Sequence, residues 1–174
     1  MNWISILVSA IIGFILGCFL PGTLNMIAIW VLKKKIQIGE ISKSALVPNV
    51  PESWYITVDV KESFWWSVLV SRVEDVVPLI TFIKHGGDER QQFESAWINP
   101  LGSADGPSIG LQIGMKRKVG IVEKYVNALV PYGQTFNNIS LIGDFDISLE
   151  LDSGYKKLCH KTFVKAIVGG LVPP

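Results

Sequence analysis

The chain has 174 residues, of which 49% are hydrophobic and 18% charged, and its net charge at pH 7 is +1. The length fits one domain, and the high hydrophobic content with almost no net charge excludes a disordered chain. The charge balance also excludes the basic surplus on which nucleic-acid binding depends.

The hydrophobic residues are concentrated at the start of the chain. The run from Trp3 to Leu32 has 30 residues without a charge, 22 of them apolar, and Lys33, Lys34 and Lys35 follow it directly. A hydrocarbon core about 30 Å thick needs about 20 apolar residues in a helix. We therefore expect residues 1–35 to form a transmembrane anchor in a lipid bilayer, with the lysines as its stop.

Pro21 leaves the arrangement of this segment open. A proline inside a helix removes a backbone hydrogen bond and kinks the helix. The segment is then one long helix kinked near Pro21, a spanning helix followed by an interfacial one, or a hairpin whose second arm is too short to cross. Trp3 and Trp30 lie where aromatic residues are favoured at membrane interfaces, which favours the single helix.

Two other N-terminal signals fit the segment less well. A secretory signal peptide has a basic start and a short apolar core, and this segment has neither feature. Residues 15–18, ILGC, resemble the lipid-attachment motif of lipoproteins, but Leu16 is bulky for its position. The residues after Cys18 are also apolar where a lipoprotein has a polar linker, so we favour the transmembrane anchor.

The lysines predict an orientation. Cytoplasmic flanks of membrane helices carry the excess of lysine and arginine. Here this excess follows the apolar run, at Lys33, Lys34, Lys35 and Lys43, and none precedes it. We expect the rest of the chain to lie in the cytoplasm, the alternative being a domain that is exported and anchored.

Small residues recur every fourth position in the apolar run, at Ser9, Gly13 and Gly17. This spacing places them on one face of a helix, where small side chains let a second helix approach closely in lipid. The stripe predicts packing against another membrane protein or a second copy of this chain.

The soluble part begins after a predicted linker at residues 36–53, which is rich in proline, serine and asparagine. Residues 54–168 then show apolar residues alternating with polar ones, which indicates half-buried strands. Pro78 predicts a break or a sheet edge in one of them. The predicted strands are Trp54–Val60, Val68–Val73, Val76–Ile83, Phe93–Ile98, Ile109–Ile113, Lys116–Tyr125, Phe145–Asp152 and Lys161–Val168, and residues 169–174 form a tail.

Strands of this length and spacing predict an all-β domain, a β-sandwich of immunoglobulin type with about seven strands. The closing hairpin, GDFDISLELDSGYKKLCHKTFVKAI, resembles the last two strands of prokaryotic immunoglobulin-like or fibronectin-III-like modules. The segment WYITVDV resembles their first long core strand. The resemblance covers residues 54–168 and implies that fold, while the Cys–Trp–Cys signature of antibody domains is missing.

The sequence contains no recognisable catalytic, cofactor or metal site. Cys18 lies in the predicted anchor and Cys159 in the last hairpin, so no disulfide is expected. His160 is adjacent to Cys159 and would point to the opposite face of a strand, which prevents joint binding of a metal. No nucleotide-binding loop or nucleophile elbow is present.

Tryptophans are the remaining candidates for a contact surface. Trp65, Trp66 and Trp97 lie near predicted strand ends, and tryptophan is enriched where proteins bind partners. The competing interpretation places one of the adjacent tryptophans in the core and the other at a sheet edge.

These features predict a membrane-anchored, non-catalytic binding or scaffold protein. The alternative is an accessory subunit of an integral membrane complex that packs through the Ser9, Gly13 and Gly17 face. We expect the partners to be the bilayer and a protein, or another copy of the chain, and not a nucleic acid.

Overall fold

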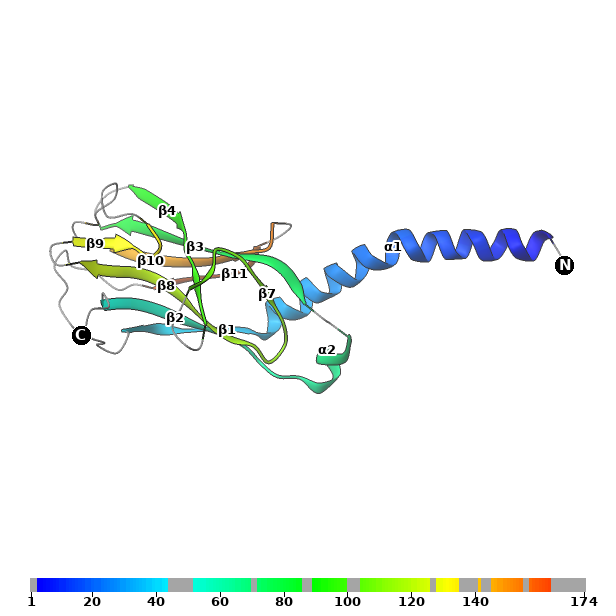
Figure 1. Ribbon diagram of the computed structural model, residues 1–174, viewed down its shortest axis with the longest axis horizontal. Helices are drawn as coiled ribbons and strands as arrows, with labels where there is room; N and C mark the ends of the chain where they lie inside the picture. The colour runs from blue at the N-terminus through cyan, green and yellow to red at the C-terminus, as the bar shows by residue number, and fades with distance from the viewer. Residues whose placement is uncertain are drawn as a thin grey trace.

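The computed structural model shows a long helix that leads into a domain of two antiparallel sheets (Figure 1). The residues that the structure describes are 3–43, 52–69, 72–85, 89–99, 104–125, 128–134, 141, 145–154 and 157–163. The predicted tail at residues 169–174, and the end of the last predicted strand at 164–168, lie outside these ranges. The prediction of an all-β domain is confirmed.

Helix α1 spans Trp3–Lys35 without interruption, so the prediction of a helix is confirmed and the hairpin is wrong. Its axis changes direction between the free part and the part that meets the sheets (Figure 1). Pro21 lies inside this helix, and a proline at an interior helix position removes one backbone hydrogen bond and disfavours a straight axis. Among the described residues, no helix combines the length and the apolar character that crossing a membrane requires.

The first sheet begins with the strand that directly follows α1. In spatial order it contains β1 (Ile36–Lys43), β2 (Glu52–Val60), β8 (Lys116–Tyr125), β5 (Trp97–Ile98) and β6 (Ala104–Gly106), and β9 (Ala128–Pro131) also pairs with β8. The second sheet contains β11 (Lys157–Phe163), β10 (Phe145–Asp152), β3 (Val73–Lys84) and β4 (Arg90–Glu94), and β7 (Ile109–Leu111) also pairs with β3. All these pairs are antiparallel, and β10 and β11 form the predicted hairpin.

One hydrophobic core joins the two sheets. In β2 every second residue from Trp54 to Val60 is buried, as alternation along a strand requires. These residues belong to one cluster with the buried residues of β3, β8 and β10. The last turns of α1 belong to the same cluster through Ala28, Ile29, Val31 and Leu32. The helix end is therefore part of the β domain rather than a separate unit.

The predicted linker at residues 36–53 is wrong over Ile36–Lys43, which forms β1 and pairs with β2 from Ile36 opposite Val60. Residues 52 and 53 also belong to a strand, the start of β2. The sequence of β1 contains a glycine and polar residues, yet six of its eight residues pair with β2. The chain thus enters the first sheet directly from the helix.

The predicted strand at Val68–Val73 is also wrong, because residues Phe64–Leu69 form the short helix α2 and β3 begins at Val73. A short apolar run is compatible with both structures, so its period alone could not decide. The described residues contain eleven strands, where the sequence predicts about seven, and five of the eleven have five residues or fewer.

Replacing Leu32 tests the junction between α1 and the sheets. The Leu32 side chain is fully buried, so Leu32→Ala leaves a cavity and should lower the free energy of unfolding by about 2–5 kcal/mol. Leu24→Ala makes the same change on an exposed part of α1 and should alter it by less than about 0.5 kcal/mol. Denaturation of the full chain in detergent, followed by near-UV circular dichroism, measures the free energy of unfolding of both variants. An equal decrease in the two variants would contradict packing of the α1 end in the core.

Candidate interaction surface

The N-terminal part of α1 projects away from the sheets and carries large apolar side chains into open space (Figure 1). Among the described side chains of α1, the exposed large apolar ones are Trp3, Ile6, Leu7, Val8, Ile11, Ile12, Phe14, Leu24, Met26, Ile27 and Trp30. They lie on all sides of the helix, and no charged residue occurs before Lys33. A helix that is apolar all round is normally covered by protein or lipid.

Ser9, Gly13 and Gly17 all lie on this exposed part of α1. A Cβ atom added at Gly13 or Gly17 would meet no described atom within 4 Å. The structure therefore places the predicted stripe on a face that is open to a neighbour. Its role in helix packing remains a prediction.

The membrane-interface residues predicted near the end of α1 divide into two groups. Trp30 is exposed, and the Lys34 Nζ atom lies 3.8 Å from the centre of its ring. Lys33 is also exposed, whereas Lys35 is half-buried. Residues on both sides of Trp30 are buried against the sheets, so Trp30 lies where the free helix meets the β domain.

The three candidate tryptophans occupy different environments. Trp65 in α2 is 75% exposed, while Trp66 packs partly buried against the core. The prediction of a contact role for Trp97 is wrong, because its side chain is fully buried in β5. The Trp97 Nε1 atom donates a hydrogen bond of 2.8 Å to the Val76 carbonyl oxygen, which satisfies its polar group inside the core.

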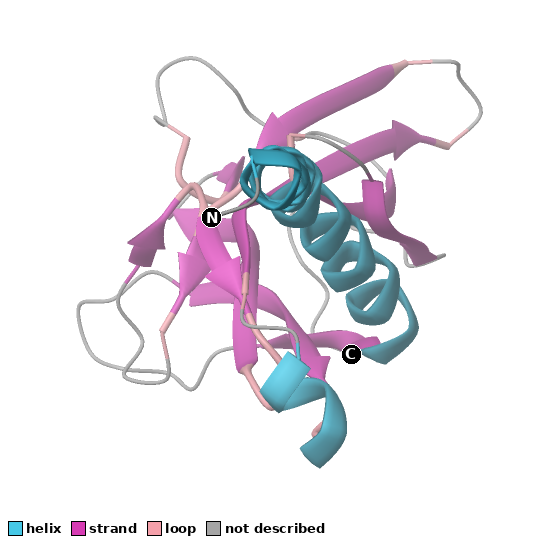
Figure 2. Ribbon diagram, turned by 90° about the vertical axis from the view of Figure 1, so that its right-hand side faces the viewer, coloured by secondary structure: helices cyan, strands magenta, loops and turns pink. Residues whose placement is uncertain are grey.

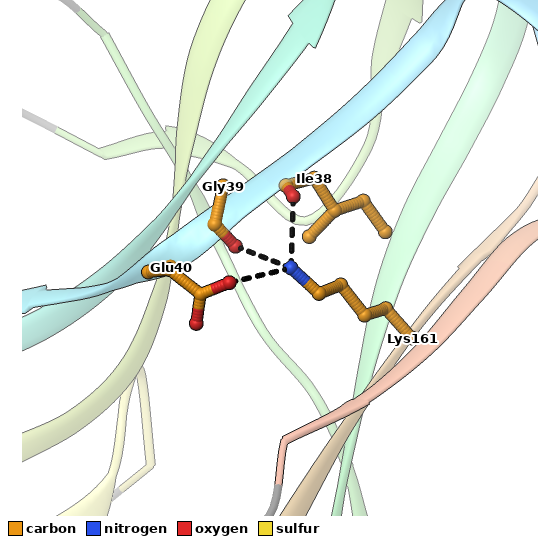
Figure 3. A network of polar contacts seen from close by, with 4 residues as sticks. All are labelled: Ile38, Gly39, Glu40 and Lys161. Atoms are coloured by element: carbon orange, nitrogen blue, oxygen red, sulfur yellow. Dashed lines mark hydrogen bonds and ion pairs between the residues drawn. The ribbon is translucent and has the colours of Figure 1, made fainter.

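Sequence reasoning missed a polar network around Lys161 in β11 (Figure 3). The Lys161 Nζ atom donates hydrogen bonds to the carbonyl oxygens of Ile38 at 3.1 Å and Gly39 at 3.3 Å. It also lies 3.0 Å from the Glu40 Oε1 atom. Gly39 and Glu40 together oppose the single residue Thr57 of β2, so β1 has a bulge here.

At this bulge the two carbonyl oxygens accept hydrogen bonds from a side chain of the second sheet. Lys161 thereby links the edge strand β1 to the edge strand β11. An open, polar hollow of about 620 Å³ adjoins this link, and the side chains around it include Thr57, Asp59 and Lys116. Because Lys161 already binds both strands, the network is a structural clamp between the sheets.

Groups that could support chemistry are sparse in the described part of the chain. No group of three or more histidine, cysteine or acidic side chains there is arranged to hold a metal ion. Burial raises the pKa of the Cys159 thiol from 9.0 to about 11, and the Glu150 carboxylate acts in the same direction. A hydrogen bond involving the Leu151 backbone and the charge of Lys33 lower this pKa, but less than burial raises it. Cys159 is therefore a protonated, weakly nucleophilic thiol at neutral pH.

Removing the Lys161 ammonium tests the clamp. Lys161→Met should lower the free energy of unfolding by about 1–2 kcal/mol, because two carbonyl oxygens lose a partly buried donor. Lys157→Met in the same strand removes an ion pair between the exposed Lys157 and the half-buried Glu150, leaves no backbone carbonyl without its donor, and should cost less than about 1 kcal/mol. Urea denaturation compares the two variants, and equal effects would argue against the clamp.

The raised pKa of Cys159 predicts slow alkylation. In a Cys18→Ala background, the rate with iodoacetamide should rise with pH to half its limit near pH 11, because only the thiolate reacts. Below that pH the folded thiol keeps its proton. The same chain unfolded in urea provides the control, with its half-maximal rate near the ordinary pKa. A midpoint near pH 9 in the folded chain would contradict the predicted burial effect.

The comparisons with known proteins add no relative. No protein-family model matches the chain, and neither a curated protein nor a solved structure matches it. The resemblance of residues 54–168 to immunoglobulin-like modules therefore remains a prediction.

Proposed function

We propose that the protein is a membrane-anchored, non-catalytic binding or scaffold module, whose β domain is an immunoglobulin-like sandwich. One observation carries the proposal: α1 has exposed apolar side chains along its free part and a buried end inside the β domain. The free part fits a lipid environment, and the buried end holds the domain to it. A bilayer is the partner that covers an apolar helix on every side.

The dimensions support this assignment. Trp3–Leu20 contains 18 residues without a charge, and at 1.5 Å per residue it measures about 27 Å, close to the hydrocarbon thickness of about 30 Å. Leu24, Met26 and Ile27 extend the exposed apolar surface toward the sheets. Lys33 and Lys34 then fall beyond the membrane core, on the side of the β domain. By the charge rule this side is the cytoplasm, and an exported, anchored domain is the alternative.

Binding suits the domain better than catalysis. In the part of the domain that the structure describes, no histidine, cysteine and acidic side chains are grouped to hold a metal ion, and Cys159 is a protonated thiol. Its sheets instead present edge strands, of which β4 has mostly exposed side chains. An unpaired strand edge offers backbone hydrogen bonds to an extended segment of a partner.

The open face at Gly13 and Gly17 favours a second function, that of an accessory subunit in an integral membrane complex. Small residues at this spacing allow a neighbouring helix to approach closely. In that case the partner is recognised within the membrane and the β domain is a cytoplasmic extension of the complex.

Charges placed in the middle of α1 test the anchor. Ile11→Lys together with Phe14→Lys should abolish stable retention in membranes, since each lysine costs about 2.5–3.5 kcal/mol at the centre of a spanning helix. Gln91→Lys together with Gln92→Lys adds the same charge on exposed positions of β4 and should leave retention unchanged. Sedimentation of membranes after alkaline carbonate extraction measures retention, and retention of the α1 variant would refute the anchor.

The second function has its own test. Gly13→Ile together with Gly17→Ile keeps the helix apolar but removes the small face. Loss of partners that co-purify in mild detergent would favour the accessory subunit, while an unchanged set would favour recognition through the β domain.

A further inference from the structure

Helix α2 lies at the same end of the β domain as α1. It is displaced from the sheets toward the side on which α1 leaves, and it lies in front when the molecule is viewed from that side (Figures 1 and 2). The Lys61 backbone nitrogen donates a hydrogen bond of 3.1 Å to the Lys35 carbonyl oxygen at the end of α1. Phe64 follows three residues later, so the chain places α2 within about 10 Å of this contact.

The outer surface of α2 is apolar. Phe64, Trp65 and Val68 are 76%, 75% and 73% exposed, the highest exposures among the large hydrophobic residues outside α1. Phe64 and Val68 are four residues apart and share a helix face, and the rings of Phe64 and Trp65 meet edge to face at 5.7 Å. Trp66 packs against the core, which directs the other three side chains outward.

Basic residues lie in the segments that adjoin this apolar tip. Lys33, Lys34 and Lys61 are exposed around the contact between α1 and the segment that leads to α2. Glu62 is the acidic residue between them and α2, and Arg72 on the far side is paired with Glu74. Asp75, next to Glu74, is also exposed. The four basic residues of these segments therefore outnumber the three acidic ones by one, and this small positive excess is complementary to an anionic lipid surface.

We propose that α2 inserts Phe64, Trp65 and Val68 into the headgroup region of the bilayer that holds α1, and that the adjacent lysines bind anionic lipid headgroups. Aromatic side chains prefer this region, and a basic, apolar surface binds it when the lipid is acidic. The proposal rests on the proposed membrane anchor. It adds a second contact point, so that α1 and α2 together fix the orientation of the sheets above the membrane.

Fluorescence quenching by lipid separates the two proposals. The full chain, with Cys18→Ala and Cys159→Ala, receives one cysteine at a time for a fluorescent NBD label, through Ile11→Cys, Trp65→Cys, Val68→Cys or Gln91→Cys. All four side chains are exposed, so none of these changes opens a cavity. Gln91 lies opposite Phe82, toward the end of β3 that is remote from α2, and is the matched distal control. Each labelled chain is reconstituted into vesicles that contain phosphatidylserine and a phosphatidylcholine with a spin label in its headgroup or acyl chain.

We expect the labels at positions 65 and 68 to lose most of their emission to the headgroup spin label, and the label at position 11 to lose it to the acyl-chain spin label. The label at position 91 should keep its emission in both cases. Quenching at 11 with none at 65 or 68 beyond that at 91 would overturn the α2 proposal and leave the anchor intact, and would assign this surface to a protein partner. Emission retained at 11 would overturn the anchor, and the α2 proposal with it.

The charge contribution has a separate readout. Vesicles of phosphatidylcholine alone should give weaker quenching at position 65, and Lys61→Gln should reduce the difference between the two lipid compositions. Quenching at position 65 that is the same with and without phosphatidylserine would overturn the role assigned to the lysines.

Discussion

Burial of the last turns of α1 in the core shared by the two sheets is the contact on which the rest of the structure depends. Val31 and Leu32 are almost completely buried there. Four residues after Leu32, Ile36 begins β1 and pairs with Val60 of β2. Because helix and strand follow without a connector, the helix cannot turn freely against the domain. A force or a contact on α1 is thus transmitted directly to an edge strand of the first sheet.

Two further contacts stabilise this arrangement from either side. The Lys61 backbone nitrogen donates a hydrogen bond to the Lys35 carbonyl oxygen at the end of α1, and α2 begins three residues later at Phe64. Lys161 joins the bulge of β1 to β11, so the edge strand next to the helix is held by both sheets. Both contacts link segments far apart in the chain, and together they orient the helix, the edge strand and α2 toward one end of the domain.

The strands that the sequence predicts best are those with one face in the core. Phe145–Asp152 has the same bounds in sequence and structure, because its apolar residues alternate with polar ones and face the core. Lys116–Tyr125 also keeps its predicted bounds, although residues 119–122 are all buried and its register with β2 shifts there. The sequence predicts a break or a sheet edge at Pro78, and the local pattern could not decide between them. Pro78 lies inside β3 opposite Leu151, yet on the other side of β3 the partner changes there, from β7 at Val76 to β4 at Leu79. The missing N–H group of proline therefore falls at a gap between two partners.

The sequence by itself determined the uncharged apolar helix, the lysines after it and the all-β class of the domain, since these follow from composition and local period. Only the tertiary structure decided that Ile36–Lys43 is a strand, that Trp97 is core while Trp65 is surface, and that α2 lies beside the end of α1. Each of these depends on a partner distant in the chain. The local sequence does not identify that partner, because the same short apolar run is compatible with a helix, a strand or an exposed surface segment.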